Sequence, residues 1–196
     1  MRLHGEVVFS RSTVMKEAKH YSEYRQDLRR DFVFRCGYCS KIEKLTTTGF
    51  EIDHFVPQAI DKDRVCDYSN LVYSCFTCNR KKGAKWPTNL AELCNDGVKG
   101  FVDPVSDEFD EHLGRNESGE IIYYSELGKY MAEDVFKFQF RPVKLIWKLN
   151  MLIEKRKILA KFITENSNYE KEDGLLLAEF CQQIDQLSEY IFEKRE

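Results

Sequence analysis

The sequence predicts an α+β protein in which a small unit of two strands and a helix is flanked by helical segments. Three observations support this class. Two cysteine pairs share the spacing Cys-x-x-Cys, the stretch between them carries two short β-type runs, and the end of the chain keeps the apolar spacing of long helices. Short strands followed by separate helices are typical of α+β proteins. The paired cysteines further indicate that a metal ion holds the small unit together.

The N-terminal segment, residues 1–32, is predicted to be helical. Its apolar residues recur at helical spacing, so we expect one amphipathic helix from Ser12 to about Phe32, with Ser12 or Thr13 as its N-cap. The apolar stripe consists of Val14, Ala18, Tyr21, Leu28 and Phe32.

Residues 33–85 are predicted to form the central module, a hairpin followed by a helix. The run from 46 to 55 is rich in Thr, Ile and Phe and suits a short bent strand, which Pro57 ends because proline disrupts regular pairing. A second short run at 70–74 supplies the partner strand, and residues 76–82 can form one or two helical turns. The predicted order is therefore strand, strand, helix.

Residues 86–196 are predicted to form a hairpin and a mainly helical C-terminal region. A short helix at 89–94 precedes a hairpin with its turn at 116–119, and two long helices follow at about 143–162 and 174–192. Two interpretations of the long helices stay open. They form an antiparallel pair that folds back on itself, or they form a docking surface for a partner protein or a second copy of the chain.

The two cysteine pairs supply a complete ligand set for a tetrahedral structural Zn²⁺ ion, namely Cys36, Cys39, Cys75 and Cys78. The N-terminus lacks the apolar run of a secretory signal, and no apolar stretch is long enough to cross a bilayer. We therefore expect a cytoplasmic protein without a membrane partner, in which paired cysteines bind metal rather than form disulfides. Zinc would also rigidify a module that is too small to be held by apolar packing alone.

Basic side chains gather near the cysteine pairs although the chain as a whole is acidic. The formal net charge is −3, yet Arg80, Lys81 and Lys82 directly follow the second pair. Phosphate binding depends on the local field rather than on the net charge, so these residues are candidates for contacts with a nucleic acid. A solvated charged face is the alternative for any single cluster.

Polar residues between and just after the cysteine pairs complete a recognisable pattern. Asp53 and His54 end the first predicted strand, Asn70 begins the second run, and Asn79 directly follows the second cysteine pair. With the cysteines, this arrangement resembles the HNH endonuclease family, of the kind in which a ββα-metal fold is braced by a four-cysteine zinc site. In this sequence Asn79 stands where the family name has its second histidine. The residues that carry the resemblance are Cys36, Cys39, Asp53, His54, Pro57, Asn70, Cys75, Cys78, Asn79 and Lys82.

The resemblance implies metal-dependent hydrolysis of phosphodiester bonds in DNA. It assigns His54 as the general base, and Asp53 with Asn79 as the holders of a catalytic Mg²⁺ or Mn²⁺ ion, hard cations that suit carboxylate and amide oxygens. It implies that Asn70 orients the loop that carries His54. The three basic residues after the second cysteine pair are expected to contact flanking phosphates without reading bases.

Two other functions explain part of the pattern. A non-catalytic zinc-ribbon adaptor that binds nucleic acid or protein would use the cysteines and the basic residues. It gives no reason for the ordered appearance of Asp53-His54, Asn70 and Asn79. An RNA-cleaving toxin would use the same site, because metal-assisted hydrolysis does not select the sugar. The nuclease interpretation also fits a role in antiviral defence or restriction in a bacterial or phage setting. The protein would then act with an ATPase or sensor protein as partner, or it would form a homodimer. His112 is expected to be structural rather than catalytic.

Overall fold

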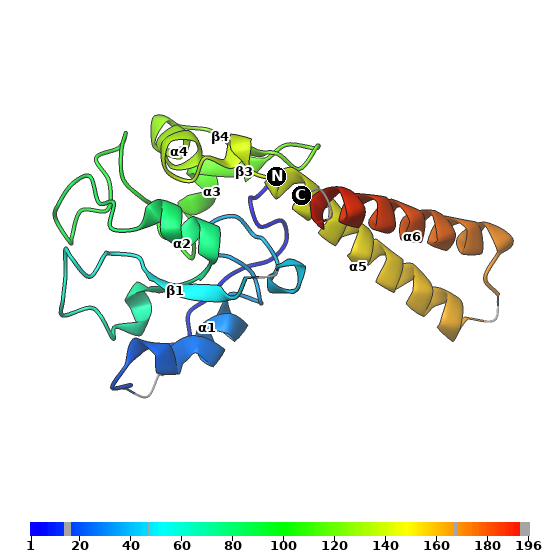
Figure 1. The fold of residues 1–196 in the computed structure, drawn as a ribbon, viewed down its shortest axis with the longest axis horizontal. Helices are drawn as coiled ribbons and strands as arrows, with labels where there is room; N and C mark the ends of the chain where they lie inside the picture. Colours follow the sequence, from blue (N-terminus) through cyan, green and yellow to red (C-terminus); the bar gives the residue numbers. More distant parts are fainter. Residues whose placement is uncertain (14–16, 47, 167, 193–196) are drawn as a thin grey trace. The chain divides into compact units, whose positions relative to one another are not determined.

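A computed structural model of the 196-residue chain describes four stretches, residues 1–13, 17–46, 48–166 and 168–192. The chain divides into two units, residues 1–141 and residues 142–196 (Figure 1). Unit 1 holds two small antiparallel sheets and several short helices, and unit 2 holds two long helices. The mixture of helix and sheet confirms the predicted α+β class.

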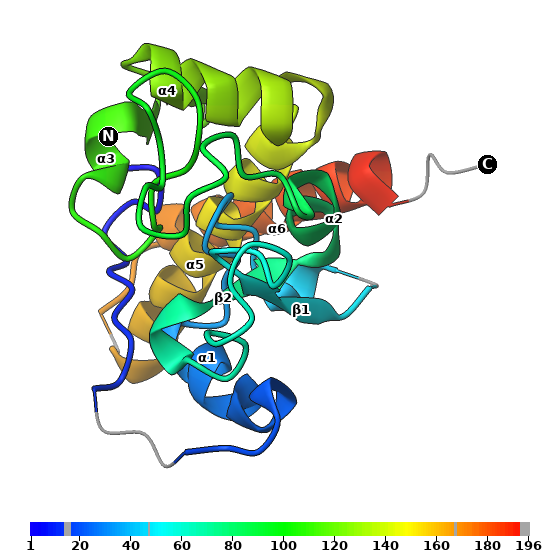
Figure 2. The same cartoon turned by 90° about the vertical axis from the view of Figure 1, so that its left-hand side faces the viewer.

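Unit 1 is built around a two-stranded sheet and the helix that follows it. Strand β1 (Phe50–His54) pairs antiparallel with β2 (Leu71–Cys75), so that His54 lies opposite Leu71. Helix α2 (Phe76–Lys82) begins at the residue after β2 and packs against both strands (Figure 2). Every residue of β2 is buried, because β1 and helices of unit 1 pack against this strand. The predicted order of strand, strand and helix is confirmed.

The N-terminal helix is shorter than predicted. A 3₁₀ turn, η1 (Tyr21–Tyr24), leads into α1 (Arg25–Asp31). The predicted start at Ser12 is wrong, because the backbone N–H and the hydroxyl of Ser12 both donate to the carboxylate of Asp31 and hold the chain outside a helix there. The predicted helical positions 14–16 lie outside the described residues.

The rest of unit 1 consists of short elements joined by turns. The hairpin predicted around a turn at 116–119 is confirmed by strands β3 and β4. The helix after it continues into a π-helical turn. In chain order these elements, with two earlier 3₁₀ turns, are η2 (Glu43–Leu45), η3 (Tyr68–Asn70), α3 (Phe109–His112), β3 (Leu113–Arg115), β4 (Ile121–Tyr123), α4 (Glu126–Lys129), η4 (Tyr130–Val135) and η5 (Phe138–Phe140).

The helix predicted at residues 89–94 is wrong. The Thr88 hydroxyl bonds the backbone carbonyls of Leu90 and Leu93, and Asn89 has a left-handed backbone with φ of 57°. Side-chain bonds to nearby backbone groups compete with a helix, and a left-handed residue interrupts one. The segment therefore forms a series of turns.

A buried arginine connects three distant segments of unit 1. Arg115 is almost completely buried, and its guanidinium donates to the carbonyl oxygens of Leu3, Gly119 and Cys39. These bonds link the N-terminus, the β3–β4 hairpin and the first cysteine turn. Buried carbonyl groups need such partners, so the side chain satisfies backbone that would otherwise be costly to bury.

Unit 2 is an antiparallel pair of helices. Helix α5 (Val143–Glu165) packs along α6 (Lys171–Phe192), as the apolar spacing predicts. Among the described residues of α6 only Ile184 is buried. No helix in the described stretches is both long enough and apolar enough to cross a membrane.

Candidate active site and zinc clamp

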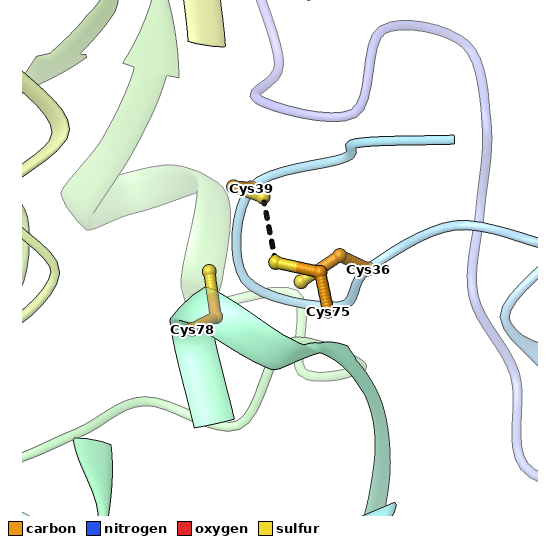
Figure 3. Close-up of side chains that lie close together, drawn as sticks. All are labelled: Cys36, Cys39, Cys75 and Cys78. Atoms are coloured by element: carbon orange, nitrogen blue, oxygen red, sulfur yellow. Dashed lines mark hydrogen bonds between the residues drawn. The ribbon is translucent and has the colours of Figure 1, made fainter. Parts of the chain in front are cut away.

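Four cysteine side chains converge where α2 begins, and we call this group the zinc clamp. Cys36 and Cys39 come from the turn after α1, Cys75 ends β2, and Cys78 lies in the first turn of α2 (Figure 3). All four are buried, and their sulfur atoms lie within 4.8 Å of one another. The sulfur atoms of Cys39 and Cys75 are 3.8 Å apart. Zinc–sulfur bonds of about 2.3 Å in a tetrahedron also place sulfurs about 3.8 Å apart, so these residues fit a structural zinc ion.

The first cysteine turn is pressed against β2, and its glycine makes this approach feasible. The backbone N–H of Gly37 donates to the carbonyl oxygen of Tyr73 at 2.9 Å. A β-carbon at Gly37 would lie 2.8 Å from Val72 Cγ1 and 2.9 Å from the ring of Phe32. A larger residue would force the turn or these side chains to shift, so the glycine lets the first cysteine turn lie close to β2.

His54 ends β1 with both ring nitrogens hydrogen-bonded. Its Nε2 lies 2.9 Å from the carbonyl oxygen of Val65, which can only accept, so Nε2 carries the proton. Nδ1 then has the lone pair and accepts from the Gln58 amide, whose nitrogen lies 3.1 Å from Nδ1 and 3.3 Å from Nε2. Burial lowers the pKa of His54, against the opposing effects of the Val65 carbonyl and Asp53. A neutral imidazole with its lone pair on Nδ1 can take a proton from water.

Asn70 fixes the loop that follows His54. Its side-chain oxygen accepts from the backbone N–H of Val56 at 2.8 Å, and its amide donates to the carbonyl oxygens of Val56 at 3.1 Å and Arg64 at 3.3 Å. The side chain is completely buried, so these bonds are shielded from water. This geometry suits the predicted role of Asn70 in orienting His54.

Asp53 is buried in an ion pair. Its carboxylate lies 3.1 Å from Lys82 Nζ and accepts a second bond from the Tyr38 hydroxyl. Lys82 also donates to the backbone carbonyl of His54 at 2.7 Å. Burial raises the pKa of Asp53 and lowers that of Lys82, while their mutual attraction opposes both shifts. The pair therefore fixes the end of β1 on α2.

Asn79 bonds a carboxylate that the sequence analysis missed. The Asn79 amide donates to Glu51 at 2.6 Å, and Arg80 donates to the other oxygen of Glu51 at 3.0 Å. The two expected metal-binding residues therefore have different partners. Asn79 bonds Glu51, whereas Asp53 bonds Lys82 and Tyr38. Residues two apart on a strand face the same side, so the position of Glu51 two residues before Asp53 was the signal that could have identified it.

Residues 36–85 match the family model of the HNH endonucleases. The chain carries an HNH domain. The matched stretch begins at the first ligand of the zinc clamp and ends just after α2, about a quarter of the chain. Neither the curated proteins nor the solved structures compared with the chain gave a match.

The three basic residues of α2 in the HNH domain have different surroundings. Lys82 is completely buried, which corrects the expectation that it contacts a flanking phosphate, because its ammonium group is held by Asp53 and a carbonyl. Arg80 is exposed and Lys81 is half-buried, so both are close enough to solvent to meet a phosphate.

His112 lies outside the HNH domain and has a structural partner. Its Nδ1 is 2.6 Å from the hydroxyl of Ser125, and the same hydroxyl caps α4 by accepting from the backbone N–H of Gly128. This contact accounts for His112 without a catalytic role, as expected from the sequence.

Proposed function

We propose that the chain is a metal-dependent endonuclease that hydrolyses phosphodiester bonds in DNA. The match to the HNH family supports a nuclease that acts on nucleic acid. The observation that carries the proposal is the hydrogen bonding of His54, whose Nε2–H is used by Val65 while Nδ1 keeps a lone pair that faces the Gln58 amide. Hydrolysis at neutral pH needs such a base.

In the proposed reaction His54 activates a water molecule. The water replaces the Gln58 amide at Nδ1, gives its proton to that nitrogen and attacks phosphorus. The bond from phosphorus to the 3′ oxygen breaks, and a second water protonates the leaving oxygen. The products carry a 5′-phosphate and a 3′-hydroxyl group. Asn70 keeps the loop after His54 in place during this step.

Asp53 and Asn79 are proposed to hold Mg²⁺ or Mn²⁺. Their oxygens, with the neighbouring carboxylate of Glu51, are the hard donors that these cations prefer. When bound, such an ion supplies positive charge to the scissile phosphate and the leaving oxygen. Asp53 would have to exchange part of its bonding with Lys82 for this role.

Arg80 and Lys81 are proposed to contact phosphates beside the cleavage site. Both stand on α2, close to Asn79 in the sequence, and are accessible to solvent, whereas Lys82 is buried. Such contacts position the sugar-phosphate backbone and give little sequence selectivity. Their salt dependence follows from the release of counterions on binding.

The test is a cleavage assay with the full chain, zinc-loaded, on plasmid DNA, single-stranded DNA and RNA with Mg²⁺ or Mn²⁺. We expect His54→Ala to lower the rate about 10²- to 10⁴-fold, the usual contribution of a general base, while DNA binding persists. His112→Ala is the matched control and should cleave normally. A wild-type chain that binds DNA but cuts nothing would support the adaptor instead. Cleavage confined to RNA would support the toxin.

We also propose a cytoplasmic role in antiviral defence or restriction. In this role the chain binds an ATPase or sensor protein, or it forms a homodimer. Unit 2 supports this idea, because α5 and α6 expose large apolar side chains such as Ile158 and Leu175. Light scattering of the purified chain distinguishes a monomer from a dimer. A purified monomer that cuts one defined sequence unaided contradicts both forms of the idea.

A further inference from the structure

Arg141 reaches the zinc clamp from the last residue of unit 1. Its Nη1 donates to Cys78 Sγ at 3.3 Å, and its Nη2 lies 3.4 Å from the same sulfur. Nη2 is also 3.8 Å from Cys75 Sγ and 3.9 Å from Cys39 Sγ. One guanidinium thus faces three of the four sulfurs. The fourth, Cys36 Sγ, lies 3.8 Å from the hydroxyl of Ser74.

An aromatic stack holds the segment before Arg141 against the clamp. Phe136 stacks on Tyr38, which lies between the first two cysteines, with ring centroids 4.8 Å apart. Phe138 stacks on Phe136 at 5.3 Å, and the guanidinium of Arg141 lies 5.3 Å from the Phe138 ring. Arg141 also donates to the carbonyl oxygen of Phe136 at 3.2 Å. The arginine is therefore fixed in its direction by contacts that do not involve the sulfurs.

The charge of the clamp makes such a partner useful. Four thiolates around Zn²⁺ carry a net charge of about −2, and the sulfurs here are buried. A buried negative centre without a counter-charge is costly, and electron-rich thiolates react with oxidants and electrophiles. A guanidinium that hydrogen-bonds to several sulfurs reduces both effects, because it offsets charge and withdraws electron density.

We propose that Arg141 is part of the zinc centre, as the cation that hydrogen-bonds its sulfurs and retains the metal. The proposal rests on the four-cysteine site holding zinc. It implies that the metal centre is not complete within residues 36–85, because a necessary partner lies far beyond the matched stretch. Removal of Arg141 should therefore loosen zinc without removing any ligand.

The first measurement is zinc release from the full chain, followed with a chromogenic chelator during treatment with a thiol-modifying reagent. Arg141→Met removes the charge and keeps much of the volume, and we expect release about 10- to 100-fold faster, as for other residues that bond metal ligands. Arg141→Lys keeps the charge with fewer donors and should lie between. Arg11→Met is the control, since the side chain of that half-buried arginine bonds Leu71 and Asp103 and no clamp residue.

The second measurement separates hydrogen bonds to sulfur from general stability. With Co²⁺ in place of zinc, the sulfur-to-cobalt charge-transfer absorption should move to lower energy in Arg141→Met, because unbonded thiolates give up electrons more easily. It should stay unchanged in Arg11→Met. If Arg141→Met does not fold, the spectrum is measured on Arg141→Lys, whose absorption should move in the same direction by a smaller amount. Release at the wild-type rate with an unchanged spectrum overturns the proposal. A wild-type chain that binds no zinc would instead remove its premise, irrespective of the cleavage result.

Discussion

The zinc clamp and the candidate active site share one HNH domain but are assembled by different means. In the clamp four identical donors, all buried, converge within 4.8 Å. At the active site each polar group has its own partner: His54 bonds Val65 and Gln58, Asn79 bonds Glu51, and Asp53 bonds Lys82. The clamp thus depends on one shared centre, whereas the active site depends on several separate hydrogen bonds. Loss of one clamp residue should therefore affect the whole domain, and loss of one site residue should act locally.

Removal of a single clamp ligand should have the largest effect. In Cys75→Ser one thiolate is lost from a fully buried set, so we expect zinc to be lost and the free energy of unfolding of unit 1 to fall by more than about 4 kcal/mol. Zinc stoichiometry and thermal unfolding followed by circular dichroism measure this. Cys181→Ser, in α6 and outside the clamp, should behave like the wild type. A zinc-loaded, stable Cys75→Ser protein would show that the clamp does not act as one centre.

Breaking the ion pair on α2 should rank second. In Lys82→Met the buried Asp53 carboxylate loses its counter-charge, which should cost about 3–5 kcal/mol, as is usual when one partner of a buried pair is removed. Denaturant unfolding measures the loss. The double variant Lys82→Met/Asp53→Asn should recover part of it, because a neutral amide is cheaper to bury. Lys81→Met is the neighbouring control, with a change within about 0.5 kcal/mol. Equal stability of Lys82→Met and Lys81→Met would contradict the structural role of Lys82.

The sequence predicted the clamp more completely than the site, for a physical reason. Cysteine spacing along two tight turns is a local property, so all four ligands could be named in advance. The position of His54 at a strand end was also predictable from the short β-type run before it. The choice of partners was not, because the burial of Lys82 and the contact of Asn79 with Glu51 arise only when α2 packs on β1. Arg141 gave no signal, since it approaches the clamp from another part of unit 1.

Glu51 tests whether the active site depends on individual contacts. In Glu51→Gln the amide of Asn79 loses a charged acceptor, so its orientation should relax while the fold stays intact. We expect cleavage to fall about 10- to 100-fold, with a higher Mg²⁺ concentration needed for half-maximal rate. A metal titration of the cleavage rate measures both. Arg80→Gln removes the other partner of Glu51 and serves as control, since it should raise the salt sensitivity of binding more than the metal requirement. An unchanged metal requirement in Glu51→Gln would mean that Asn79 is held by other contacts.

Two buried histidines sharpen the comparison through pH. Both ring nitrogens of His54 have hydrogen-bond partners, whereas those of His4 have none among the described residues. The ring of His4 packs on Phe9 and Phe109, with centroids 4.4 and 5.4 Å away, and burial, the largest cause, together with nearby Arg115 lowers its pKa to about 3. The folded state therefore binds the His4 proton less readily than the unfolded state does. Stability from this residue is complete above pH about 6.5 and is lost as the pH falls toward 3.

Replacement of His4 by phenylalanine should remove this acid sensitivity and leave the aromatic packing in place. At pH 5.5 the wild type should have lost about 1.4 kcal/mol through His4 relative to neutral pH, so His4→Phe should gain that amount relative to the wild type between pH 7.5 and 5.5. Denaturant unfolding of both proteins at the two pH values measures the difference. Protonation of the clamp thiolates weakens both proteins alike and cancels in the comparison. If the difference in unfolding free energy between His4→Phe and the wild type is the same at both pH values, charged His4 gains a proton acceptor in the folded state. The surroundings of His4 would then adapt locally, as is expected for the active site.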